Sequence, residues 1–267
     1  MPFEEVERVK FKHNSLTNVI CQLRFPTILE IEKEVPSDFQ NFIAGRFSDV
    51  NIALDMPEPV DMRFDVGQQV SFGVSLNRVQ QPRKNYCFYS SDSNYVVNLT
   101  RNFLSLSTQN YDRWENFREV MKYVLDAFVK VYEERDLTRV GLRYINAISK
   151  RKLNFPEDTQ WGELINPYLL GIMGDTKLSQ CVKGINSTTL LNCVGESINM
   201  QIQCGIFAKM EDTSEEVFLI DTDTFSTKKN TTDTVMDLLE NLHEKPRRFL
   251  HYAIRGKLYK AMEPERI

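Results

Sequence analysis

The stretch Thr-Arg-Val-Gly-Leu-Arg-Tyr-Ile-Asn-Ala-Ile at residues 138–148 decides the fold class. Apolar side chains alternate with arginine or glycine along much of this stretch. Alternate residues of a β-strand share one face of a sheet. The apolar face consists of Val140, Leu142, Tyr144 and Ile148. The stretch therefore predicts a strand with one buried face.

A long amphipathic helix is predicted just before this strand, over residues 112–135. Its apolar side chains recur at the three-to-four spacing that places them on one side of a helix. Asp112 and Glu115 resemble a capping box, because carboxylates are favoured near the positive end of a helix. Since only a few residues separate helix and strand, we expect the helix to cover one face of the sheet.

Shorter periodic segments extend this pattern in both directions along the chain. The other predicted strands are residues 14–25, several short strands within 60–107, and residues 188–194, 198–209 and 217–225. The other predicted helices are a short one that opens at Pro36, one near residues 161–170, and a stretch at 232–261. Pro246 should kink or split the last of these, because its ring clashes with the preceding turn.

Runs of short strands with helices between them predict an α+β fold. We expect antiparallel sheets in two sheet-plus-helix halves, with long amphipathic helices packed on the sheets. The halves would be residues 1–152 and 153–267, closely joined and compatible with a single domain.

Composition excludes several classes of protein. Hydrophobic residues make up 42% of the chain and charged residues 26%, which is typical of a globular protein and not of a disordered one. There is no run of 18 apolar residues and no apolar core near the N-terminus, so we expect a cytoplasmic protein without membrane insertion. The five cysteines form no C-x-x-C pair, which argues against a zinc or redox motif. No cofactor is expected.

Four ordered motifs resemble a known family. They lie at residues 102–117, 138–148, 218–225 and 238–249, the second being the most specific. Together they are similar to the TIGR04255 family, a sporadically distributed group of bacterial proteins of about this length. The family begins with a Pro-Pro-Ile segment, whereas residues 14–17 here contain no proline. The resemblance implies an order of elements, bacterial origin and a role in phage defence or a toxin–antitoxin-like module, but no catalytic residues.

Two arginines on the strand at 138–148 are candidates for anion binding. Arg139 and Arg143 share the face opposite the apolar one and flank Gly141, so their guanidinium groups would form a cradle for a phosphate or a nucleotide. The alternative is that both arginines form ion pairs with acidic side chains of neighbouring strands.

Two aspartates on the strand at 217–225 are weak candidates for a metal site. Asp221 and Asp223 project from one face, and Mg²⁺ prefers carboxylate oxygens. A metal-dependent phosphoryl-transfer enzyme or nuclease would need a third acid. The alternative is that these aspartates pair with Arg139 and Arg143 across a joined sheet.

A cluster of cations near the C-terminus predicts a basic interaction surface for an acidic partner or nucleic acid. Its members are Lys245, Arg247, Arg248, Arg255, Lys257 and Lys260. The net charge of −4 disfavours nucleic acid. His13, His243 and His251 show no H-E-x-x-H spacing, so no helical zinc site is predicted and His243 is expected to pack or cap on the last helix.

Because no catalytic template fits, the sequence favours a non-catalytic binding or interaction protein, with a protein partner or a second copy. The alternatives are the metal-dependent enzyme using Asp221 and Asp223, and a nucleotide or anion sensor using Arg139 and Arg143.

Overall fold

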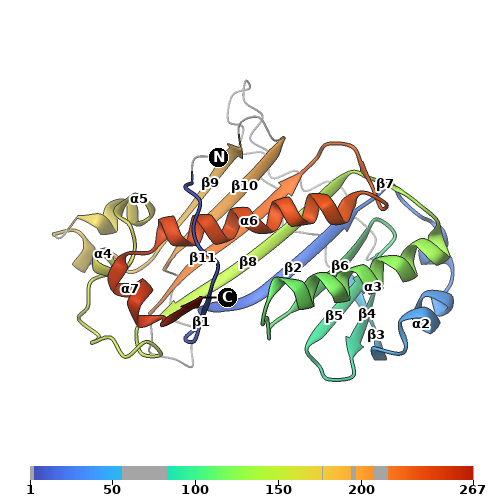
Figure 1. The fold of residues 1–267 in the computed structure, drawn as a ribbon, viewed down its shortest axis with the longest axis horizontal. Coiled ribbons are helices and arrows are strands. Elements are labelled where there is room, and N and C mark those ends of the chain that lie inside the picture. The colour runs from blue at the N-terminus through green and yellow to red at the C-terminus, as the bar shows by residue number, and fades with distance from the viewer. Residues whose placement is uncertain (1–2, 56–82, 176, 194–196, 207–215, 267) are drawn as a thin grey trace.

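A nine-stranded antiparallel sheet forms the centre of the molecule (Figure 1). The structure is a computed structural model that describes residues 3–55, 83–175, 177–193, 197–206 and 216–266. The strand order is β3-β4-β5-β6-β2-β8-β11-β10-β9. The strands are β2 (Leu16–Arg24), β3 (Phe47–Asp55), β4 (Arg83–Ser90), β5 (Tyr95–Leu99), β6 (Phe103–Thr108), β8 (Arg139–Ser149), β9 (Ile185–Cys193), β10 (Ile198–Ile206) and β11 (Val217–Ser226).

Strand β8 lies in the middle of the sheet, between β2 and β11. The alternation predicted from the sequence is confirmed, because Val140, Leu142 and Tyr144 are buried on one face. The register sets Tyr144 opposite Val19 of β2 and Thr222 of β11. Tyr144 therefore projects from the centre of the sheet toward the side that carries the long helices.

Two helices of 19 residues each, α3 (Trp114–Tyr132) and α6 (Val235–Ala253), lie on the same face of the sheet (Figure 1). Each buries one side, as the three-to-four spacing of apolar residues requires. Helix α3 contributes Phe117, Met121 and Phe128 to the core between the helix and the sheet. The C-terminal half of α6 contributes Phe249 and Ala253 to a second core cluster. Among the described residues, no helix is long and apolar enough to cross a membrane.

The order of elements repeats on the two sides of the β2–β8 pair. From β2 outward the sheet runs β6, β5, β4 and an additional edge strand β3, and α3 follows β6 in the chain. From β8 outward it runs β11, β10, β9, and α6 follows β11. Hydrogen bonds between β2 and β8 make the two sides one continuous sheet.

Smaller elements complete the fold at its edges. Two short two-stranded sheets pair β1 (Val9–Phe11) with β13 (Pro264–Arg266) and β7 (Asp136–Leu137) with β12 (Asn230–Thr231). The remaining helices are α1 (Glu30–Lys33), α2 (Ser37–Ile43), α4 (Trp161–Leu164), α5 (Pro167–Leu170), α7 (Gly256–Ala261) and the 3₁₀ turns Gly171–Gly174 and Ser179–Cys181.

Most predicted strands and helices are confirmed, but the short elements α1, β1, β7, β12 and β13 were not predicted, and three further features differ. Strand β3 was not predicted, and the part of the predicted meander at residues 60–82 lies outside the described residues, as do residues 207–209. Helix α6 runs through Pro246 and breaks at Ile254 instead, where the backbone becomes extended. The predicted capping box is wrong, because no side-chain cap bond forms at the start of α3 and both carboxylates bind other partners.

Candidate ligand-binding pocket

A cavity of about 130 Å³ lies between α3, α6 and the centre of the sheet. We call it the central pocket. Its wall combines β8, the start of α3, the middle of α6 and a stretch near the N-terminus. The lining residues are 8–11, 14, 16, 111–114, 144, 146, 243, 246, 247 and 250.

A buried pair, Tyr144 and His243, forms one side of the pocket. The Tyr144 hydroxyl lies 2.9 Å from His243 Nδ1, joining β8 to α6. The indole of Trp114 stacks on the imidazole, with ring centroids 4.4 Å apart and an angle of 5°. Trp114 Nε1 in turn donates to Glu240 of α6 at 2.8 Å. These contacts connect α3, α6 and the sheet at a single point.

Burial sets the charge state of both members of the pair. Desolvation lowers the pKa of His243 to about 4, so its imidazole is neutral near pH 7. Desolvation also raises the pKa of Tyr144 well above its ordinary value, so its hydroxyl keeps its proton. The pair is therefore a neutral hydrogen bond at physiological pH.

Two buried nitrogens of the pocket residues have no hydrogen-bond partner among the described residues. They are His243 Nε2 and Arg247 Nε. His243 and Arg247 are four residues apart on α6, so their side chains emerge on the same side of the helix. Buried polar atoms without a partner are rare in native proteins, so both nitrogens call for an explanation.

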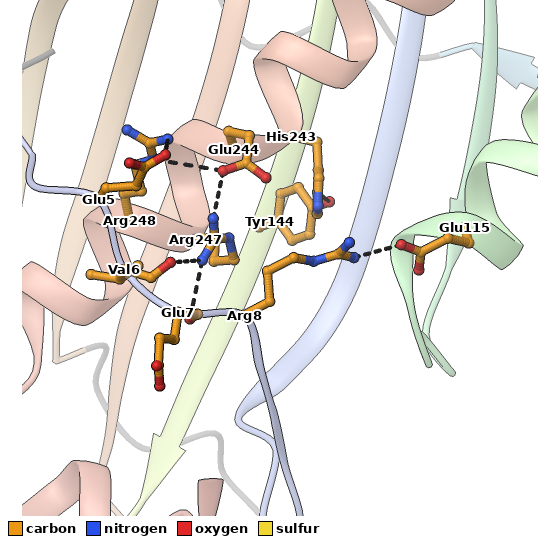
Figure 2. Close-up of polar contacts among 10 residues, drawn as sticks. All are labelled: Glu5, Val6, Glu7, Arg8, Glu115, Tyr144, His243, Glu244, Arg247 and Arg248. Carbon is orange, nitrogen blue, oxygen red and sulfur yellow. Dashed lines mark hydrogen bonds and ion pairs between the residues drawn. The ribbon is translucent and has the colours of Figure 1, made fainter. Parts of the chain in front are cut away.

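The N-terminal segment, defined as residues 3–13, closes one side of the pocket and crosses over α6 (Figure 1). Figure 2 shows how α6 holds it: Arg247 Nη1 donates to the carbonyl oxygens of Val6 at 2.7 Å and Glu7 at 3.2 Å. The second Nη of Arg247 donates to Glu244. Phe3 is buried beside Phe249 of α6, with ring centroids 5.4 Å apart.

The other end of this segment is tied to α3 and to the C-terminus. Arg8 reaches across to Glu115 of α3 at 2.6 Å (Figure 2). Lys10 binds Asp112 just before the same helix. These are the two carboxylates expected to cap α3, so they serve to attach the N-terminal segment. Beyond them, β1 pairs with β13.

The arginines and aspartates singled out in the sequence meet one another on the opposite face of the sheet. Arg139 Nη2 lies 2.6 Å from Asp223, and Arg143 Nε lies 2.9 Å from Asp221. The hydrogen bond from Arg143 and its charge contact with Asp221 raise the Arg143 pKa. These are the ion pairs expected under the alternative interpretation of each motif.

The proposed cradle above Gly141 is filled by Arg139 itself. A Cβ at Gly141 would lie 2.4 Å from Arg139 Nη1, which shows that the guanidinium covers the glycine. The guanidinium also lies over the ring of Phe225, 4.5 Å from its centroid. The glycine thus makes room for an ion pair within the chain.

The predicted basic surface is divided among several environments. Lys245 is buried, and Arg247 and Arg248 face the N-terminal segment and Glu244. Arg255 donates to the carbonyl oxygen of Gly162 at 2.6 Å, Lys257 pairs with Glu163, and Lys260 is exposed. The six cations therefore do not share one exposed face.

Within the part of the chain that the structure describes, no group of three or more His, Cys, Asp or Glu side chains is placed to hold a metal ion. His13 lies 3.6 Å from Glu263, whereas His243 packs on the last helix as expected. Burial raises the pKa of the Cys21 thiol to about 12, which makes it a poor nucleophile.

The central pocket was not predicted from the sequence, although one signal for it was present. His243 follows Leu239 and Leu242 on the apolar stripe of the last helix, a position that indicates a buried histidine. The partner of that histidine, Tyr144, is 99 residues away, and only the register of the sheet brings the two together.

Fold and pocket together define an α+β protein with a small cavity between two helices on one face of an antiparallel sheet. Comparison with protein-family models finds no match, and comparison with curated proteins finds none either.

Proposed function

We propose that this chain is a non-catalytic binding protein and that the central pocket is its binding site. The observation that carries the proposal is a pair of buried, unpartnered nitrogens, His243 Nε2 and Arg247 Nε, on two residues that line an aromatic cavity. Ligand sites are typically concave and largely apolar, with a few convergent polar groups. A bound molecule would supply the missing hydrogen-bond partners.

The charge states of the pocket support binding rather than proton transfer. A general acid or base works best with a pKa near the operating pH. The pKa of His243 lies near 4 and that of Tyr144 is raised well above its ordinary value, so both are far from neutrality in opposite directions. Neither group is poised to exchange a proton during turnover.

The functions centred on the opposite face of the sheet receive less support. A metal enzyme using Asp221 and Asp223, or an anion sensor using Arg139 and Arg143, would first have to break the ion pairs that these residues form with one another.

A protein partner or second copy, and a place in a bacterial defence or toxin–antitoxin-like module, are proposals that rest on the family resemblance. The division into two sheet-plus-helix halves is likewise a proposal, supported by the repeated order of elements.

Tryptophan fluorescence tests the binding proposal directly. The chain has two tryptophans, so Trp161→Phe leaves Trp114, which lines the pocket, as the single reporter. Trp161 is buried, donates to Glu216 at 2.9 Å and lies under Lys150, so its replacement by Phe should cost about 2–3 kcal/mol without unfolding the protein. Circular dichroism checks the fold of the variant.

The variant is titrated with three single-ring compounds: benzyl alcohol, benzylamine and benzoate. We expect at least one to change the Trp114 emission saturably, because any occupant of the pocket lies against its wall. If none of the three does so at millimolar concentration, the pocket is not a binding site and the proposed function is wrong.

A further inference from the structure

The two unpartnered nitrogens indicate what kind of chemical group the pocket binds. Arg247 Nε carries a hydrogen at every accessible pH, so it is a donor without an acceptor. His243 is neutral, and it has two tautomers: in the one in which Tyr144 donates to Nδ1, the ring hydrogen lies on Nε2 and makes a second donor, and an acceptor bound at Nε2 selects this tautomer. In that tautomer the two donors lie one helical turn apart and match a group with two acceptor atoms, which a carboxylate has.

The cations around the pocket are all paired with carboxylates. Four of the residues around the pocket are cations, Arg8, Lys10, Arg113 and Arg247, and one is an anion, Asp112. Glu115 and Glu244, which pair with Arg8 and Arg247, are not among the lining residues. When these two carboxylates are counted with Asp112, the charges around the pocket nearly balance, so the two nitrogens and not net charge select the ligand.

Size and wall chemistry limit the rest of the molecule. An apolar cavity of roughly 150 Å³ accommodates one benzene molecule, and the central pocket measures about 130 Å³. Trp114, Tyr111 and Tyr144 present rings to it, and aromatic rings prefer to stack or meet edge to face. A single aromatic ring matches this volume.

We propose that the central pocket binds a small monocyclic aromatic carboxylic acid, with its carboxylate on Arg247 Nε and His243 Nε2 and its ring beside Trp114. This inference rests on the proposed function, because it names the ligand class of the same site. It identifies the chemistry that the site recognises, a benzoate-like acid.

Isothermal titration calorimetry of the full chain near pH 7 tests the ligand class. The probes are benzoate, the neutral benzyl alcohol, the cationic benzylamine and the non-aromatic acetate. We expect benzoate to bind at least tenfold more tightly than each of the others, because it alone combines the ring with the carboxylate.

Two pocket variants and one control variant test whether benzoate binds in the central pocket. Arg247→Met and His243→Phe each remove one donor, and both should weaken benzoate by tenfold or more and by a larger factor than they weaken benzyl alcohol, which has no carboxylate. His243 makes no described hydrogen bond to the N-terminal segment, so its variant separates loss of the donor from loosening of that segment. Arg255→Met is the matched control, because Arg255 binds Gly162 away from the pocket, and its benzoate affinity should be unchanged.

The outcomes separate the two proposals. If benzyl alcohol or benzylamine binds as tightly as benzoate, the ligand class is wrong while the pocket still stands as a binding site. If benzoate binds and neither donor variant weakens it, the acid occupies another site and the inference is overturned. If no ring compound binds, the proposed function itself is wrong.

Discussion

At the scale of single residues, the buried imidazole of His243 should make stability depend on pH. Its pKa is about 4 in the folded protein and near 6.5 in the unfolded chain. As the pH falls below 6.5, the unfolded chain therefore binds a proton that the folded protein does not bind. The free energy of unfolding should therefore fall between pH 6.5 and 4, by up to roughly 3 kcal/mol from this residue. Below pH 4 this contribution becomes constant.

Urea denaturation at a series of pH values, with His243→Phe as the comparison, measures the effect. The carboxylates near the pocket, among them Glu115 and Glu244, titrate in both proteins and largely cancel in the difference. We expect the variant to show the shallower loss between pH 6.5 and 4. Equal slopes in the two proteins would mean that His243 is not neutral and buried as described.

Gly141 offers a second test at this scale. A methyl group there would push aside the Arg139 guanidinium, which lies over Phe225 and pairs with Asp223. Gly141→Ala should therefore destabilise the protein by about 1–2 kcal/mol in thermal or urea unfolding. Gly256→Ala is the control, since nothing lies within 4 Å of its added Cβ, and it should change stability by less than about 1 kcal/mol. Equal effects of the two changes would contradict this geometry.

At the scale of elements, Arg247 should be a main attachment of the N-terminal segment, together with the burial of Phe3 and the pairing of β1 with β13. Arg247→Met removes the donors to the carbonyl oxygens of Val6 and Glu7, and the exposed pairs at Arg8 and Lys10 contribute little. Amide hydrogen exchange within residues 4–13 should then accelerate about tenfold or more. The same protection in Arg247→Met as in the matched Arg255→Met would show that other contacts hold this segment.

Individual elements could be predicted from the sequence because their signals are local. The strand at 138–148 and the helix at 112–135 follow from the spacing of apolar residues, which is set by the geometry of each element. The capping box at Asp112 failed for a physical reason: Lys10, more than a hundred residues away in the chain, binds that carboxylate. A local pattern contains no information about such a partner.

At the scale of the whole molecule, the central pocket exists only because distant segments converge. Residues 8–11, 111–114, 144 and 243–250 meet through the register of β8 in the sheet and the packing of two helices on it. The ion pairs of Asp221 and Asp223 were within reach of sequence reasoning, since both motifs lie on strands. The pocket was not, because its residues share no motif.

The central claim, that this pocket holds a small molecule, is tested most directly by a crystal soaked with para-bromobenzoate. The anomalous signal of bromine locates the molecule without reference to any assumed pose. We predict a bromine peak inside the central pocket, within contact distance of Trp114 and Tyr144, with the carboxylate toward Arg247. A peak elsewhere on the protein with an empty pocket, from a compound that binds in solution, would contradict the account.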